Sequence, residues 1–342
     1  MPPLRLVFFG SDPISLPLLE WLRGDGKTVA EVLAVFTQPD RPVGRGQKIT
    51  ANAIKTWAVT HGLPVFQPEK LTDAVRQQFV SLGADAGLVM AYGHILKDDF
   101  IASARLGMLN LHASILPKYR GASPIQTAIA NGDRETGVTL MRVVRKLDAG
   151  PAADVERVPI QKLDTAIEIE ARLAAACVPL LARTLPKLRE GTLEFVPQDE
   201  AQATFCRKLV KDDGALDFAL SARTLAARIN GLYPWPACTI EIAGQPVKLG
   251  QAETCEEIGK MVPGQLVRAD LAGLCVATGQ GILRILKLQR PGGKMLGTAD
   301  FLRGFPIDLN MRLTSHEMRE LVGLSPFRRG ASAPGGPDQR AT

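Results

Sequence analysis

The sequence MLNLHASILP at residues 108–117 says most about both the fold and the chemistry of this chain. Its first part, Met108–His112, is a short apolar run that contains an asparagine and ends in a histidine, which predicts a strand buried on both faces. Alternate side chains of a strand point the same way, so Asn110 and His112 share one face. Ligands of open α/β sheets bind at the carboxyl ends of strands, where we expect this pair.

Short apolar runs alternate with helical patterns on both sides of this stretch, which indicates βαβ units on a parallel sheet. Further strands are predicted at Leu6–Phe9, Val32–Phe36, Ala86–Met90 and Val138–Val144. The predicted helices are Pro17–Arg23, Asn52–His61, Lys70–Leu82, Ser123–Ala130 and Ile167–Arg189. The turn FGSDP at residues 9–13 lacks the second and third glycines of a dinucleotide fingerprint. The first half is therefore predicted to be a Rossmann-like, mostly parallel α/β sheet domain without a dinucleotide loop.

The pattern changes after about residue 190. Short β-rich runs separated by glycines follow at Thr239–Ile242, Pro246–Leu249, Gly264–Val267, Leu274–Ala277 and Ile282–Leu288. They predict a small antiparallel, OB-like β-barrel. We therefore expect a first domain at residues 1–190, a linker at 191–209, a barrel domain at 210–325 and a disordered tail at 326–342.

Composition indicates a soluble protein of a reducing compartment. The 342 residues are 46% hydrophobic and 22% charged, and no apolar run approaches the roughly 20 residues of a membrane helix. The five cysteines are scattered without C-x-x-C spacing, which argues against a disulfide framework or a zinc site. The net charge of +6 permits a polyanionic partner without demanding one. We expect a cytoplasmic protein that has no membrane contact.

A carboxylate completes the candidate catalytic group. Asp148 stands in LDAG at residues 147–150, after a predicted strand, and parallel strands would bring it to the same sheet edge as Asn110 and His112. An amide, an imidazole and a carboxylate can together stabilise an oxyanion and move a proton. No Ser or Cys nucleophile stands in a recognisable elbow, which favours direct transfer over a covalent intermediate. From spacing alone, a structural histidine, a turn aspartate and a capping asparagine explain the residues at least as well.

The surrounding motifs give a second, more specific argument. They are FTQPDRPVGRG (36–46), GLPVFQP (62–68), AYG (91–93), NLHASILP (110–117), YRGASPIQ (119–126), GD (132–133), TGVT (136–139), LDAG (147–150), YPWP (233–236) and GQPVK (244–248). With these motifs in this order over roughly residues 4–325, the chain closely resembles the bacterial methionyl-tRNA formyltransferases, a folate-dependent formyltransferase family.

The resemblance implies a reaction and its catalytic residues. The donor would be 10-formyltetrahydrofolate, the acceptor would be the α-amine of methionine on initiator tRNA, and no metal would take part. Asn110, His112 and Asp148 match the family's catalytic trio. Asn110 and a charged His112 would donate hydrogen bonds to the oxyanion, while Asp148 would keep His112 charged and relay a proton to the leaving folate nitrogen. We expect the protein to be a monomer.

The resemblance also implies the position of the folate. Ser114, Ile115, Leu116 and Pro117 match the family's S-L-L-P motif beside the folate, with an isoleucine in place of the usual leucine, a change that keeps the volume. The segment Tyr92 and Gly93 follows a strand end and is expected to line the same pocket. After LDAG the chain departs from the family pattern with PAADV at residues 151–155, which leaves the pairing of that strand open.

The segment at residues 38–49 predicts a mobile basic loop. Arg41, Arg45 and Lys48 alternate with glycines and a proline, and the place of the segment after the second strand favours contact with the acceptor stem of tRNA. A solvated surface loop is an equally good interpretation.

Two residues and one motif are assigned more loosely. Lys118 and Arg120 are expected to meet phosphate or the charged tail of the folate, with a solvated surface as the alternative. The YPWP motif at residues 233–236 is expected to anchor the core of the second domain rather than to contact tRNA.

Other functions would share the catalytic trio. A formyltransferase acting on a sugar amine or on glycinamide ribonucleotide, or a formyl-folate hydrolase, is not expected to carry RPVGRG at residues 41–46. A non-catalytic tRNA-binding protein on an inherited enzyme fold is disfavoured, because all three polar residues remain in register.

Overall fold

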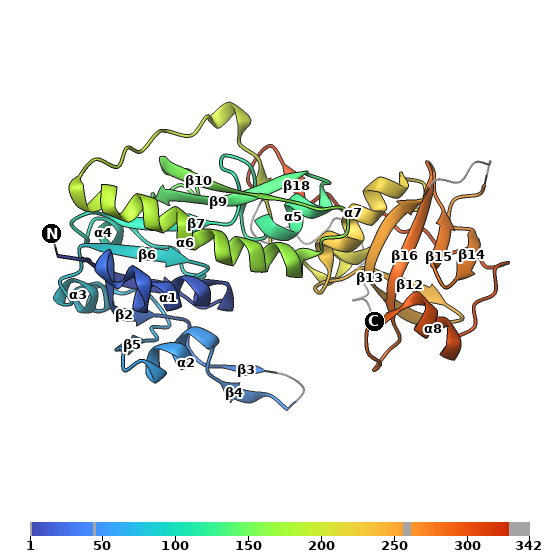
Figure 1. The fold of residues 1–342 in the computed structure, drawn as a ribbon, viewed down its shortest axis with the longest axis horizontal. Helices are drawn as coiled ribbons and strands as arrows, with labels where there is room; N and C mark the ends of the chain where they lie inside the picture. The colour runs from blue at the N-terminus through green and yellow to red at the C-terminus, as the bar shows by residue number, and fades with distance from the viewer. Residues whose placement is uncertain (1, 44–45, 256–260, 328–342) are drawn as a thin grey trace, which may run out of the picture.

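A seven-stranded sheet forms the centre of the first half of the chain (Figure 1). The computed structural model describes residues 2–43, 46–255 and 261–327. β7 and its neighbours on one side are parallel, whereas β9 and β10 are antiparallel to the strands they pair with. The predicted Rossmann-like, mostly parallel sheet is thereby confirmed. In spatial order the strands are β10 (Ala152–Pro159), β9 (Glu135–Arg142), β7 (Met108–His112), β6 (Ala86–Met90), β1 (Leu4–Gly10), β2 (Ala30–Phe36) and β5 (Val65–Phe66).

Apolar side chains cover both faces of this sheet. On β1, Leu6 and Phe8 enter the cluster formed with α1, α2, α5 and α6, whereas Val7 and Phe9 enter the cluster formed with α3 and α4. Burial on both faces explains why β1 is almost continuously apolar, since neither face meets water. The helices are α1 (Leu16–Arg23), α2 (Ala53–Thr60), α3 (Asp73–Ser81), α4 (Asp98–Ile101), α5 (Pro124–Ala130) and α6 (Ala166–Glu190).

Local sequence sets the ends of the helices. The Asn52 side chain accepts a hydrogen bond from the Lys55 amide at the start of α2. Thr165 and Glu168 form a capping box at the start of α6, and Gly191 ends that helix with a φ of +73°. Because such caps can be recognised in the sequence, these two helices match their predicted ranges to within one residue at each end.

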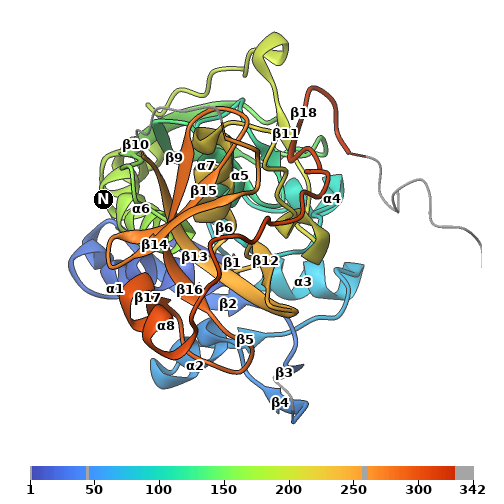
Figure 2. The ribbon, with the colours of Figure 1, turned by 90° about the vertical axis from the view of Figure 1, so that its right-hand side faces the viewer.

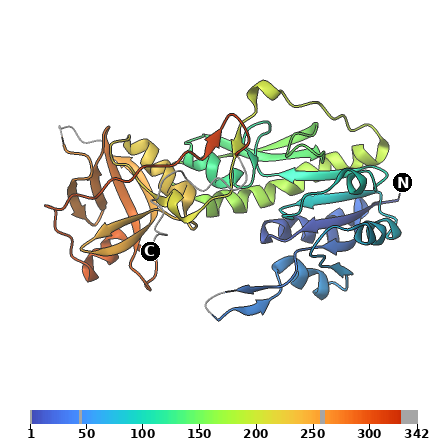
Figure 3. The same cartoon turned by 180° about the vertical axis from the view of Figure 1, so that it is seen from behind.

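The segment after α6 returns to the first half and packs onto it, as Figure 3 shows from behind. Val196 forms a bridge with Ala152, the first residue of β10. Further along, β11 (Phe205–Cys206) pairs with β8 (Arg120–Gly121) and with β18 (Val322–Gly323), which comes from near the end of the described chain. The predicted linker is therefore held by backbone hydrogen bonds beside the residues that follow β7.

The second half contains a curled antiparallel sheet (Figure 2). All five of its strands that the sequence predicted are present, although β13 is longer than predicted, and the outer strands β12 and β14 do not pair with each other in the described residues. The predicted barrel is thus a half-barrel, and two helices in this half were not predicted. Its elements are α7 (Ala222–Leu232), β12 (Thr239–Ile242), β13 (Gln245–Cys255), β14 (Leu266–Asp270), β15 (Gly273–Ala277), β16 (Ile282–Gln289), β17 (Leu296–Gly297) and α8 (Thr298–Gly304).

Helices α5 and α7 join the two halves. A Cβ added to Gly231 of α7 would lie 2.5 Å from the Ala130 nitrogen and 2.7 Å from the Gln126 carbonyl oxygen of α5. The helices approach this closely because position 231 has no side chain. The buried Asn230 amide then ties α7 to β13 through hydrogen bonds of 2.9 and 2.8 Å with the backbone of Ala252.

The predicted mobile loop forms a hairpin where the structure describes it. β3 (Arg41–Val43) pairs antiparallel with β4 (Lys48–Thr50), and the hairpin projects from the sheet domain (Figure 1). At its base, Lys55 contacts Asp40 at 2.6 Å, and hydrogen bonds from Gln67 and Lys55 lower the pKa of that carboxyl. The loop prediction is therefore corrected to a hairpin anchored at its base.

Candidate active site

Asn110 and His112 lie on β7, and a loop brings Asp148 to them. β9 is antiparallel to β7, with Arg142 beside Leu109, so the carboxyl end of β9 lies at the start of β7. The parallel packing assumed from the sequence would have placed it at the opposite edge. The loop that follows β9 folds back and places Asp148 Oδ2 3.7 Å from His112 Nδ1. His112 and Asp148 therefore meet through a returning loop rather than through a shared edge of parallel strands.

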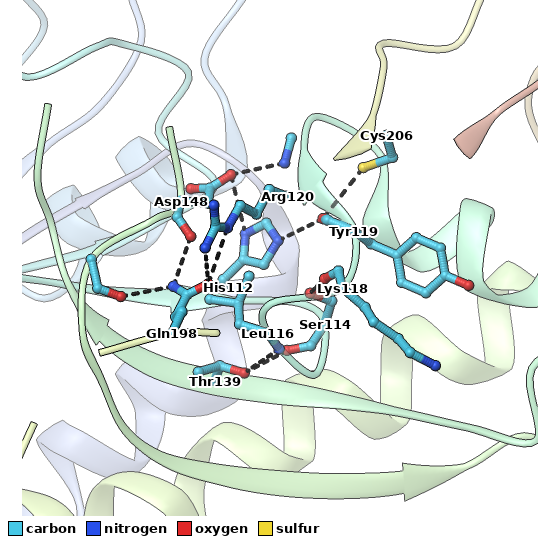
Figure 4. Close-up of polar contacts among 12 residues, drawn as sticks. His112, Ser114, Leu116, Lys118, Tyr119, Arg120, Thr139, Asp148, Gln198 and Cys206 are labelled. Atoms are coloured by element: carbon cyan, nitrogen blue, oxygen red, sulfur yellow. Dashed lines mark hydrogen bonds and ion pairs between the residues drawn. The ribbon is translucent and has the colours of Figure 1, made fainter. Parts of the chain in front are cut away.

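His112 is buried, and one of its nitrogens is already bonded (Figure 4). Its Nε2 lies 2.9 Å from the Tyr119 carbonyl oxygen, and because a carbonyl can only accept, Nε2 donates the hydrogen. The Cys206 thiol donates to the same carbonyl at 3.4 Å, and burial raises the pKa of that thiol to about 11. Nδ1 is therefore the nitrogen that can exchange a proton or a hydrogen bond with a substrate.

Asp148 has one bonded and one open carboxylate oxygen. Oδ2 accepts a hydrogen bond from the Gly121 amide at 2.9 Å, while Oδ1 has no partner in the residues that the structure describes. The backbone of Asp148 has a φ of +48°, a region that aspartate tolerates better than most residues. This conformation directs the carboxylate toward His112, with Oδ1 available to accept a proton.

Asn110 supplies an unused amide. Its side chain is partly buried and has no hydrogen bond in the described part of the chain, while its backbone pairs with Val89 and Met141 on the two neighbouring strands. A rigid strand thus holds two free N–H donors on the same face as His112. Such a donor can stabilise negative charge on an oxygen at little reorganisation cost.

The predicted folate motif forms a tight turn after β7. The Thr139 hydroxyl donates to the Ser114 carbonyl at 2.6 Å and accepts from the Leu116 amide at 3.1 Å. Ser114 and Leu116 are buried, whereas Ile115 and Pro117 keep exposed surface. Folate contact by these four residues stays a prediction, for which Ile115 and Pro117 offer the accessible side chains.

Tyr92 and Gly93 follow β6 and differ in exposure. The Tyr92 ring is buried and packs edge-on against Phe9 with ring centroids 5.5 Å apart. Its hydroxyl has no hydrogen-bond partner among the described residues, and burial raises its pKa. Gly93 is exposed with a φ of +82°, and Gln38 donates to the Tyr92 carbonyl at 3.1 Å. Contact of Tyr92 and Gly93 with the folate remains a prediction, for which Gly93 offers the accessible surface.

The three basic residues predicted to contact tRNA differ in whether they are described and in whether their charge is already paired. Arg41 is exposed and forms an ion pair with Glu69 at 2.9 Å. Lys48 is exposed and makes no ion pair among the described residues. Arg45 lies outside the described residues. Lys48 is therefore the described member of this group whose charge is available to a polyanion.

Arg120 was assigned wrongly from the sequence. It was expected at a phosphate or on a solvated face, but it is fully buried. Its guanidinium donates to the side-chain oxygen of Gln198 at 3.0 and 2.8 Å and to the carboxylate of Glu200 at 3.1 and 3.0 Å. Gln198 was missed altogether, because no local pattern reveals a contact between residues 78 positions apart. Lys118 is exposed, as either interpretation of it allows.

The YPWP motif also departs from its prediction. Pro234 and Trp235 are exposed, Trp235 by 54%, and the other two residues are only partly buried, so the motif does not anchor the core of the second half. That core is formed instead by Leu225 and Ile229 of α7 with strand residues such as Leu249 and Ile285.

The described residues contain neither a cluster of metal ligands nor a helix that could span a membrane. In residues 2–43, 46–255 and 261–327, no group of three or more metal-ligating side chains is assembled. Within the same ranges, every helix is too short or too polar to cross a membrane.

Comparisons with known proteins assign the family. The family model described as formyl transferase matches residues 4–185, and the one described as formyl transferase, C-terminal domain, matches residues 208–306. The chain belongs to the formyl transferase family. Methionyl-tRNA formyltransferase of Hydrogenovibrio crunogenus is 41% identical over 300 residues, covering 87% of this chain and 95% of that protein. The enzyme of the same name from Stutzerimonas stutzeri is 42% identical over 299 residues, covering 87% and 94%.

Two solved structures share the fold of this chain. HypX from Aquifex aeolicus, solved with tetrahydrofolic acid, superposes with a TM-score of 0.59 at 17% identity, covering 87% of this chain and 46% of HypX. This chain thus spans about half the length of HypX. The sugar 3N-formyl transferase WlaRD superposes with a TM-score of 0.61 at 17% identity, covering 84% and 97%. At this identity the likeness concerns the fold alone.

Proposed function

We propose that this formyl transferase moves the formyl group of 10-formyltetrahydrofolate to the α-amine of methionyl initiator tRNA. The supporting observation is identity of about 40% with several methionyl-tRNA formyltransferases across 87% of the chain. His112, Asp148 and an unpartnered Asn110 amide are compatible with the same reaction, because an amide, an imidazole and a carboxylate can together stabilise an oxyanion and move a proton.

The reaction begins with attack of the amine on the formyl carbon. An α-amino group titrates near pH ~8, so a neutral nucleophile is present at physiological pH. Attack turns the formyl oxygen into an oxyanion, which would accept hydrogen bonds from the Asn110 amide and from His112 Nδ1–H. Nε2 of His112 stays bonded to the Tyr119 carbonyl, which keeps the ring in one orientation during the step.

Two proton movements complete the transfer. The attacking nitrogen must lose a proton, which Asp148 Oδ1 would accept directly or through a water molecule. The bond between the formyl carbon and the folate nitrogen then breaks as the oxyanion re-forms the carbonyl, and that nitrogen takes up a proton. The proton passes from amine to leaving group through one carboxylate, so the enzyme is unchanged after each turnover.

We propose that the β3–β4 hairpin and the second half of the chain contact the tRNA acceptor. Lys48 and Arg41 on the hairpin, together with Arg45, would contact phosphates of the acceptor stem. We further propose that the enzyme works in the cytoplasm, a reducing compartment that suits five buried free thiols, and that it acts as a monomer.

The experiment is a formylation assay with three acceptors: charged initiator tRNA, charged elongator tRNA and a small sugar amine. We expect transfer from 10-formyltetrahydrofolate to the initiator tRNA, with a rate that falls as salt rises because phosphate contacts release counterions. Salt-independent transfer to the sugar amine alone would replace this proposal with the sugar-amine alternative.

A further inference from the structure

Gln198, in the segment at residues 191–209 that joins the two halves, binds the backbone of the loop that carries Asp148. The Gln198 amide nitrogen donates to the Asp148 carbonyl at 2.9 Å and to the Gly150 carbonyl at 2.7 Å (Figure 4). Both bonds fall on backbone atoms around the residue whose φ is +48°. A left-handed backbone conformation at a non-glycine residue persists only where its surroundings hold it, and Gln198 provides such a restraint.

Arg120 fixes which way the Gln198 amide faces. A guanidinium has donors and no acceptor, so the atom that meets its Nε and Nη2 at 3.0 and 2.8 Å must be the amide oxygen. The amide NH₂ then faces the carbonyls of Asp148 and Gly150, which can only accept. Reversing the amide would set NH₂ against guanidinium donors and an oxygen against two carbonyls. The guanidinium and the two carbonyls therefore require the same orientation of the Gln198 amide.

Arg120 is itself held on both sides. Its guanidinium is fully buried and also binds both carboxylate oxygens of Glu200, which contacts Lys146 at 2.5 Å. Hydrogen bonds from Arg120 and then Lys146 lower the pKa of Glu200 to about 2, so that carboxylate stays ionised throughout the neutral range. Because Lys146 belongs to the same loop as Asp148, Gln198 and Glu200 hold that loop at two points.

The neighbours of Arg120 bind the proposed catalytic residues directly. The Tyr119 carbonyl accepts from His112 Nε2, and the Gly121 amide donates to Asp148 Oδ2. A displacement of Arg120 would therefore move the partners of both residues at once. No other side chain in the described residues bonds to the Asp148 carbonyl.

We propose that Gln198, oriented by Arg120, is a positioning residue that sets Asp148 against His112, so that the joining segment forms part of the active site. This inference rests on the proposed function, because it assigns the geometry of a residue in that reaction. Gln198 acts through Asp148 and touches neither substrate. Its loss should therefore lower kcat and leave the KM of both substrates unchanged.

The test replaces Gln198 in the full-length protein. Gln198→Ala removes all four hydrogen bonds, and we expect kcat to fall on the order of 10- to 100-fold, since a displacement of about 1 Å costs that much. Gln198→Glu keeps the size and an acceptor for Arg120 but turns a carboxylate oxygen toward two carbonyls, so it should lose at least as much. Gln202→Ala is the matched control, because Gln202 is exposed in the same segment and bonds only to Asp199. It should retain wild-type kcat.

A double-mutant cycle separates positioning from general support of the fold. If Gln198 acts through Asp148, Gln198→Ala should cost little further activity in an Asp148→Asn background. Each of three outcomes would overturn the inference. These are an equal loss of kcat in both backgrounds, a rise in KM without a fall in kcat, and wild-type kcat in both folded Gln198 variants. Thermal melting shows whether each variant is folded, and the Glu variant serves if the Ala variant is not. Failure of the wild-type protein to formylate tRNA would instead reject the proposed function.

Discussion

Asn110 offers the most direct test of the oxyanion at the scale of one residue, because its amide has no other bond in the described structure. Asn110→Ala should lower kcat on the order of 10²- to 10³-fold, the usual cost of removing one oxyanion donor. Donor binding should be unchanged in a folate titration, since the amide acts on charge that develops only during transfer. Asn310→Ala, at an exposed asparagine bonded to Asp308, is the matched control. Near-normal turnover of the Asn110 variant would contradict the assignment.

The placement of single residues was predicted correctly where it depends only on residues close by in the sequence. The spacing of Asn110 and His112 on a short strand predicted a shared face, and the strand is where it was expected. It failed for Arg120, whose type suggested a phosphate contact, because its burial depends on partners 78 and 80 positions away. An arginine is predicted to lie on the surface unless the acceptors around it are known, and the acceptors of Arg120 lie in a segment with no recognisable pattern.

Gly121 links two elements, β8 and β11, at the scale of secondary structure. Its φ is +124°, and a Cβ there would lie 2.0 Å from the Cys206 carbonyl oxygen. Gly121→Ala should separate the paired strands and lower the free energy of unfolding by about 2 kcal/mol or more. The kcat should also fall, because the Gly121 amide binds Asp148. The control is Gly304→Ala at the end of α8, where an added Cβ would meet only ordinary contacts. Its free energy of unfolding, measured by chemical denaturation, should change by about 0.5 kcal/mol or less.

The β3–β4 hairpin gives a second prediction at this scale. Lys48 is exposed and unpaired among the described residues, whereas Arg41 already faces Glu69. Lys48→Ala should therefore raise the KM for tRNA several-fold and reduce the slope of log affinity against log salt by ~1, the value for one phosphate contact. Slow hydrolysis of the formyl donor should be unaffected. Lys27→Ala, at an exposed lysine between α1 and β2, should change neither quantity. Equal loss of transfer and hydrolysis would show that the hairpin supports the active site instead.

The elements themselves were predictable to different degrees. The capped helices and the strands buried on both faces lie close to their predicted positions, because caps and apolar runs can be recognised from adjacent residues in the sequence. The direction of β9 was not, since a strand's partner and orientation depend on the whole sheet. The strand after Gly150, whose pairing the sequence left open, is β10, antiparallel to β9. The basic segment at residues 38–49 was predicted to be a loop because glycines and a proline are uncommon in strands. The two strands that it forms are only three residues long each.

The whole molecule depends on contacts that the domain pattern could not reveal. The chain was expected to consist of two domains joined by a linker, and the composition does change where this was predicted. In the structure, the joining segment lies against the sheet domain, and β18, from near residue 323, returns to pair with β11. A cut near residue 205 would remove a strand that borders Arg120 and Gly121, so it would not yield an intact first domain. Substitutions in the full-length chain are therefore the cleaner way to separate the two halves.

A substitution at Gly231 should change how the two halves are placed relative to each other. An alanine there would place its Cβ 2.5 to 2.8 Å from atoms of Gln126 and Ala130, so α7 must move away from α5. We expect the free energy of unfolding to fall by about 1–3 kcal/mol, the usual cost of overpacking. A tRNA held by both the hairpin and the second half requires their alignment, so its KM should rise in steady-state formylation. Donor hydrolysis, which needs the active site but no contact with tRNA, should persist. An unchanged KM in a destabilised Gly231→Ala protein would mean that tRNA is recognised by one half alone.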